Sequence, residues 1–114
     1  YVGLELAQSI YSIALDRKPT GYTKFFNADV VSVAKKDLAS GEILDGEGGF
    51  AARGRLAASK DSIGGNFLPL GLSDGAKTKK SIKKDEFIKI DDVEISWKQE
   101  VLKAREYQTK ILNK

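Results

Sequence analysis

The chain has 114 residues, of which 41% are hydrophobic and 31% charged, proportions typical of one small globular domain. It contains no histidine and no cysteine, which excludes disulfide bonds, thiolate metal sites, and catalysis by a Ser-His-Asp or Cys-His group within the chain. The net charge is +3, and its basic excess lies in residues 76–114, where 11 Lys and Arg face 7 Asp and Glu with almost no aromatic interleaving, a weak nucleic-acid signature.

Residues 1–16 are predicted to form a helix, because apolar side chains recur there at helical spacing, and Pro19 ends it. Further apolar residues, namely Val2, Tyr11 and Leu15, spread hydrophobic surface around much of the helix. We therefore expect the helix to pack on more than one partner, and we interpret the chain as a piece of a longer protein. No apolar run approaches the ~18 residues of a membrane span.

Residues 20–28 are predicted to form an irregular connection. The β-branched segment 30–34 that follows is typical of a short strand. Segment 36–42 then indicates a tight turn, in which Gly41 is available for a positive φ angle. Residues 43–44 are expected to form a second short strand or a bridge.

Residues 45–54, DGEGGFAARG, contain four glycines. The G-x-G-x-x-G pattern of dinucleotide-binding loops fails here, because Ala51 stands at the position of the third glycine. We therefore predict a glycine-rich structural loop, and we expect another loop at residues 60–66. Residues 67–72 form an apolar run interrupted by Pro69, which favours an edge or covering segment over a central strand.

A degenerate repeat organises much of the remaining sequence. Residues 76–95 can be laid on the segment 30–45 at an offset of 44 positions, which matches Lys36 with Lys80, Leu38 with Ile82, and Glu42 with Glu86. A single catalytic motif does not need to occur twice, whereas a pseudo-symmetric fold does. The repeat therefore predicts a scaffold, with short strands at residues 76–80, 87–90 and 93–95.

A charged helix is predicted from residue 97 to about residue 112. Ser96 has the character of an N-cap, and Gln99 completes a capping box with it. The apolar stripe of this helix is thin. We therefore expect the helix to cover an edge of the module or a neighbouring subunit rather than to form a core.

Two segments, AKKDLASGEILDGEGGF and NFLPLGLSDGAKTKKSIKKDEFIKIDDVEI, resemble the SAF domain. This family includes the antifreeze-like domain of sialic acid synthases, type III antifreeze proteins, and flagellar or pilus assembly chaperones. The resemblance implies a small pseudo-symmetric β-clip of short strands over residues 29–96. With the helices predicted before it and over residues 97–114, the fold class is mainly β with flanking helices. The arginine with which sialic acid synthases reach a sugar substrate has no counterpart in residues 29–32.

The flanking run GLELAQSIYSIALDRKPTG and the loop LDGEGGF resemble the C-terminal part of bacterial homoserine dehydrogenase-like SAF-domain oxidoreductases, some of which resemble deoxyxylulose phosphate reductoisomerase. In such proteins a Rossmann domain binds NAD(P) and a middle domain carries the chemistry. The resemblance implies that residues 1–19 are the last helix of the middle domain and residues 20–28 a connector.

The same resemblance implies a cytoplasmic protein whose SAF domain covers the active site or mediates homo-oligomerisation. Its partners would be the Rossmann and middle domains of the same chain, with no nucleic acid and no membrane. Cofactor, metal and catalytic residues are not expected in this chain, and NAD(P) belongs to the parent protein. The alternative is a stand-alone SAF module that binds or assembles a carbohydrate or protein ligand.

Anion binding is the local chemistry that the sequence favours. Arginines after a glycine-rich loop can clamp a carboxylate or phosphate, and lysines can attract one, although a turn or a surface ion pair explains the same residues. The candidate substrate- or anion-binding residues are Gly46, Gly48, Gly49, Arg53, Arg55, Lys79 and Lys80.

Overall fold

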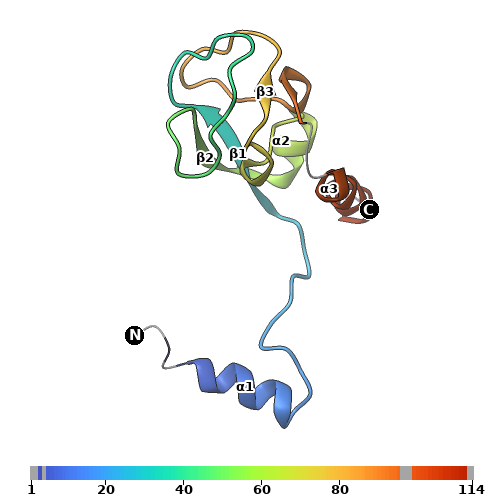
Figure 1. Ribbon diagram of the computed structural model, residues 1–114. Helices are drawn as coiled ribbons and strands as arrows, with labels where there is room; N and C mark the ends of the chain where they lie inside the picture. Colours follow the sequence, from blue (N-terminus) through green and yellow to red (C-terminus); the bar gives the residue numbers. More distant parts are fainter. Residues whose placement is uncertain (1–2, 4, 96–98, 113–114) are drawn as a thin grey trace.

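The protein consists of a small β module that one helix precedes and another follows in the sequence (Figure 1). The computed structural model describes residue 3, residues 5–95 and residues 99–112. Short antiparallel strands and flanking helices confirm the predicted fold class. In chain order the elements are α1 (Leu6–Ala14), β1 (Ala28–Ala34), β2 (Ala52–Ala58), α2 (Ser59–Gly64), a 3-10 turn (Leu70–Leu72), β3 (Lys77–Thr78), a second 3-10 turn (Ile90–Asp92), β4 (Val93–Glu94) and α3 (Gln99–Leu112).

Strand β1 is the centre of the module because both of its edges are paired. One edge is antiparallel to β2, with Val31 opposite Arg55. The other edge meets two separate segments through Ser32, whose backbone N–H donates to the carbonyl of Leu68 at 2.8 Å and whose carbonyl accepts from Ile88 at 3.0 Å. The predicted strand is confirmed, and double pairing buries its residues 31–34 completely.

The two copies of the repeat meet at Leu38 and Ile82. The N–H of Leu38 donates to the carbonyl of Ile82 at 2.8 Å, and the N–H of Ile82 donates back to the carbonyl of Leu38 at 3.0 Å. These residues are 44 positions apart, so each is the counterpart of the other. A reciprocal pair between counterparts marks the axis of the pseudo-two-fold symmetry, and both side chains are buried there.

Hydrogen bonds on either side of this axis repeat with the same offset. Gly41 donates to the carbonyl of Thr78 at 2.8 Å, and its counterpart Asp85 donates to the carbonyl of Ala34 at 2.9 Å. Gly41 and Asp85 also share a left-handed backbone, with φ angles of +86° and +69°. The turn prediction at Gly41 is therefore confirmed, and it holds in both copies.

The repeated glutamates close the two turns in the same way. Glu42 accepts a hydrogen bond from the backbone N–H of Ala39 at 3.1 Å, and Glu86 accepts one from Lys83 at 3.0 Å. Each carboxylate thus bonds an amide three positions earlier, which fixes the turn as a capping side chain does. Turn geometry explains why the glutamate recurs in both copies.

The first copy contains three residues more than the second. Lys35 donates its backbone N–H to the carbonyl of Ala51 at 2.9 Å, and Lys79, its counterpart 44 positions later, donates to Asp92 at 2.8 Å. Asp92 lies only 41 positions after Ala51. The additional residues therefore lie in the glycine-rich loop 45–51, where the two halves of the module differ in length.

The hydrophobic core lies between the two halves and is built from aliphatic side chains. Four of its members are alanines, which allows the halves to approach closely at the normal packing density of a protein interior. The buried cluster consists of Ala34, Leu38, Leu44, Ala51, Ala52, Leu68, Leu72, Ala76, Ile82, Ile88 and Val93.

Three sequence predictions need correction. Residues 60–66 were expected to form a loop, but Ser59–Gly64 form α2, because Ser62 is buried and donates its hydroxyl to Asp29 at 2.7 Å. The glycine-rich loop was expected to reach residue 54, but pairing with β1 recruits the chain into β2 from Ala52 onward. Residues 87–90 form single bridges and a 3-10 turn instead of a strand.

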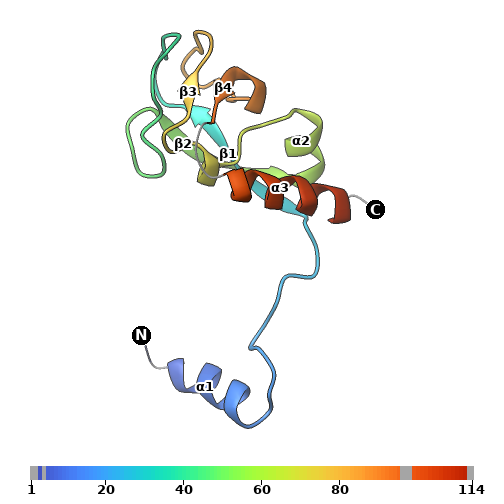
Figure 2. The same cartoon turned by 45° about the vertical axis from the view of Figure 1, so that its right-hand side comes forward.

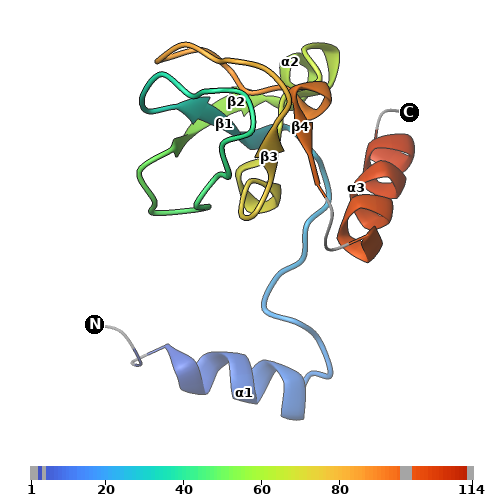
Figure 3. The same ribbon diagram turned by 45° about the horizontal axis from the view of Figure 1, so that its top comes forward.

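Helix α3 packs against the module beside α2 and the start of β1 (Figures 2 and 3). Arg105 forms an ion pair with Asp29, and its guanidinium lies over the ring of Phe26 at 4.7 Å. Leu102 adds a half-buried contact with the core. The helix thus covers an edge of the module, as predicted. The predicted N-cap Ser96 lies outside the described residues.

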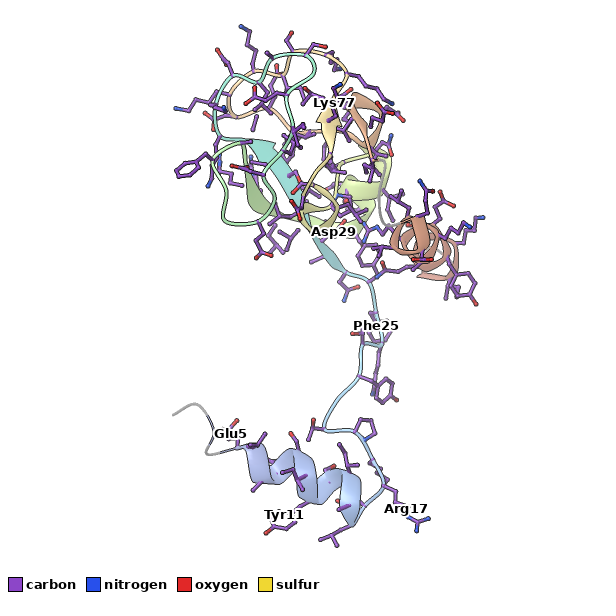
Figure 4. The ribbon with its side chains drawn as sticks, viewed as in Figure 1. Glu5, Tyr11, Arg17, Phe25, Asp29 and Lys77 are labelled. Carbon is purple, nitrogen blue, oxygen red and sulfur yellow. The ribbon has the colours of Figure 1, made fainter. Side chains whose placement is uncertain are left out.

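Helix α1 lies apart from the module, at the end of an extended connection (Figure 1). None of its residues is buried. Tyr11 on the helix lies far from the module, and both Tyr11 and Phe25 on the connection are exposed to solvent (Figure 4). Within the described residues, no helix is both long and apolar enough to cross a lipid bilayer.

Candidate functional site

Loop 45–51 is built around the carboxylate of Asp45. This side chain accepts hydrogen bonds from the backbone N–H groups of Phe50 at 2.5 Å and Ala51 at 3.0 Å. Those two amides lower the pKa of Asp45 below its usual value, because they stabilise the charged form. Lys35 donates from Nζ to the carbonyl of Gly49, so a second charged side chain holds the loop.

The three predicted glycines serve the conformation of this loop. Gly46 and Gly48 have φ angles of +74° and +79°, which favour glycine. A Cβ atom on Gly49 would lie 2.2 Å from Cγ of Asp45, so a side chain there would displace the carboxylate that organises the loop. These three positions are therefore explained by backbone geometry and close approach.

The surroundings of Gly46 are acidic. It lines a recess of about 300 Å³ together with the carboxylates of Asp45, Glu47 and Asp74. The negative charges of these carboxylates would repel an anion in the recess. Anion binding at Gly46, Gly48 and Gly49 stays a prediction, and the acidic recess beside Gly46 makes it less favourable.

A stack of side chains stands on the face of the module formed by β2 and the segment that begins at Phe87. The rings of Phe67 and Phe87 lie 4.4 Å apart and nearly parallel, with 13° between their planes. The guanidinium of Arg55 lies over Phe87, 5.3 Å from the ring centroid. Gly65 lies against Phe67, because a Cβ atom there would come within 2.5 Å of Cζ.

Two other predicted cations lie close to this stack, and both have partners. Arg53 lies on the same face of β2 as Arg55 and forms an ion pair with Asp85 at 3.0 Å. Lys80 forms one with Asp92 at 2.8 Å, which raises the pKa of the lysine. Lys80 also lines an open recess of about 390 Å³ with Phe67 and Phe87.

Of the seven predicted site residues, Arg55 and Lys80 lie beside Phe87, and Arg53 pairs with Asp85 two positions before it. Lys79 contributes its backbone N–H to the ladder and its carbonyl to Ser40 at 2.9 Å, while its side chain is exposed. Among the described residues, no group of three or more Asp and Glu is arranged to hold a metal ion.

Sequence reasoning missed the aromatic half of this site. Phe67 and Phe87 are 20 positions apart, and backbone pairing of residues 66–68 with residues 88–90 brings them together. One signal was available in the repeat: Phe87 replaces Ile43 of the first copy. An aromatic ring at a position that the other copy fills with an aliphatic side chain indicates an additional role.

Comparison with known families now identifies the module. A model described as the SAF domain matches residues 29–94, which is more than half of the chain. The chain belongs to the SAF domain family. The match begins at the start of β1 and ends with β4, so it includes both copies of the repeat and excludes α1 and α3. No curated protein matches the chain.

Asp45→Asn should make the SAF module less stable at neutral pH. The folded pKa of Asp45 is lowered, so its stabilising contribution is complete above the unfolded pKa, about 3.9, and is lost as the pH falls through the lower folded value. Urea midpoints of wild type and variant should therefore differ at pH 6 and begin to converge only below about pH 4. Glu47→Gln, in the same loop, is the charge control. A difference that does not change with pH would contradict this role.

Gly65→Ala should disrupt the stack, whereas Gly64→Ala should not. The new methyl group would push Phe67 against Phe87, at an expected cost of about 1–3 kcal/mol in unfolding free energy. A Cβ atom on Gly64 meets nothing within 4 Å, and this residue ends α2, so alanine there should stabilise by up to about 1 kcal/mol. Urea denaturation measures both, and equal effects would contradict the stacking account.

Proposed function

We propose that this chain is the C-terminal SAF domain of an NAD(P)-dependent oxidoreductase-like protein of the cytoplasm. In this proposal the domain covers the active site or mediates homo-oligomerisation, and it carries no catalytic residue. The preceding Rossmann domain binds NAD(P), and the middle domain performs the chemistry. Neither nucleic acid nor a membrane is a partner.

The exposed face of α1 is the observation that supports this proposal most. Leu6, Ile10 and Ile13 follow one another at spacings of four and three residues, so they share one side of the helix. Their exposed fractions are 65%, 57% and 63%. Burial of such side chains contributes about 1.5–3 kcal/mol each, which a packing partner outside the SAF module would supply. In the proposal this partner is the middle domain.

The composition of the chain is compatible with an accessory role. Histidine, the commonest general base, and cysteine are missing from its sequence. The run GLELAQSIYSIALDRKPTG, which contains α1, is the segment that resembles the SAF-domain oxidoreductases. The helix and the resemblance thus point to the same neighbour, a preceding domain of an enzyme.

A second candidate function is a stand-alone module that binds or assembles a carbohydrate or protein ligand. The stacked pair Phe67 and Phe87 beside an open recess supports this alternative, because half-exposed rings are common contact groups in binding sites. In this case the apolar face of α1 would contact the assembly partner.

Fluorescence titration with NADPH tests the proposal. The 114-residue chain alone is expected to leave NADPH fluorescence unchanged, whereas the protein encoded by the complete reading frame is expected to bind NADPH with micromolar affinity. Micromolar binding by the 114-residue chain would contradict the division of labour. Absence of NADPH and NADH binding by the complete protein would favour the stand-alone module, as would a signal peptide upstream.

A further inference from the structure

The two halves of the SAF module carry different chemistry at equivalent positions of their strand rows. Val33 of β1 lies between Phe87 on one side and Arg53 on the other. In the equivalent row of the other half, Lys77, the counterpart of Val33, lies between Ile43 and Glu94. Because the row of Lys77 folds without an aromatic ring or an arginine, the fold does not require them beside Val33.

Arg55 is held in a defined orientation by this asymmetric face. Its guanidinium lies over Phe87, which is itself fixed between that guanidinium and the ring of Phe67. The contact with Phe87 already restricts the rotamers of Arg55, so the side chain loses less conformational freedom when a ligand binds. A guanidinium oriented in advance binds an oxyanion at lower entropic cost.

The N–H donors of Arg55, unlike those of the neighbouring cations, are not engaged by a carboxylate among the described residues. Arg53 and Lys80 are engaged by Asp85 and Asp92. Within the part of the chain that the structure describes, the guanidinium of Arg55 contacts the Phe87 ring and no carboxylate. The side chain of Arg55 is exposed. The edge of a guanidinium presents parallel N–H donors that match two oxygens of one carboxylate or phosphoryl group.

We propose that Arg55 binds the carboxylate or phosphoryl group of a ligand, with Phe87 as the platform that orients it. This inference rests on the proposed function, in which the SAF module faces an anionic substrate or cofactor held by a neighbouring domain. Arg53 and Lys80 are each engaged by a carboxylate and take no part in this contact.

Nuclear magnetic resonance titration of the 114-residue chain tests the inference directly. Inorganic phosphate and acetate, added in separate series at constant ionic strength, should shift the Arg55 Nε–H and Phe87 ring signals with saturation. The series that saturates at lower concentration identifies the preferred group, phosphoryl or carboxylate. Arg55→Gln should weaken the binding at least about tenfold, because it removes a charge-assisted bidentate contact.

Three variants serve as controls in the same titration. Arg55→Lys keeps the charge without the planar fork and should restore only part of the affinity. Arg53→Gln should retain most of it, because Arg53 is engaged by Asp85. Lys60→Gln on α2 removes an exposed charge elsewhere and should leave the affinity unchanged. Each variant is shown to be folded by a backbone amide spectrum that matches the wild-type spectrum away from the substitution.

The inference is overturned if the shifts spread over the lysines without saturation, or if Arg55→Gln and Lys60→Gln titrate alike. If phosphate and acetate do not bind at Arg55 while the complete protein binds NADPH, the role of Arg55 is overturned and the oxidoreductase proposal stands. A saturable titration in a protein that binds neither NADPH nor NADH would overturn the oxidoreductase proposal and leave Arg55 as the ligand site of a binding module.

Discussion

The reciprocal hydrogen bonds between Leu38 and Ile82 are the contact on which the rest of the SAF module depends. They join the two copies of the repeat at the pseudo-two-fold axis, and both side chains belong to the buried core. From this pair outward, equivalent hydrogen bonds connect equivalent residues in both directions. Strands β3 and β4 have two residues each, so outside the ladder between β1 and β2 the module is held by this network of paired turns and bridges.

Symmetry separates what the fold needs from what it does not. Features present in both copies, such as the left-handed turn and the glutamate that closes it, serve the scaffold. Features present in one copy are the longer loop around Asp45 and the stack of Phe67, Phe87 and Arg55. The loop is explained by its own backbone hydrogen bonds. The stack has no such explanation, and it therefore carries the proposed anion site.

The scaffold could be predicted from the sequence because the repeat places equivalent residues at one fixed offset. Helix α2 could not, since its six residues show no apolar period and depend on a hydrogen bond from Ser62 to Asp29, 33 positions away. The same limit applies to the site. Arg55 was predicted from its charge and its place after the glycine-rich loop, whereas its partner Phe87 depends on pairing between distant segments.

Native-state hydrogen exchange measures the central claim most directly, because it gives an opening free energy for each amide. The account predicts that the amides of Leu38 and Ile82 exchange only through global unfolding, with equal free energies that match the value from urea denaturation. Amides at equivalent positions beside the axis, such as Gly41 and Asp85, should also agree with each other. If one copy opened at a much lower free energy than the other, the two halves would not form one symmetric unit and the account would be wrong.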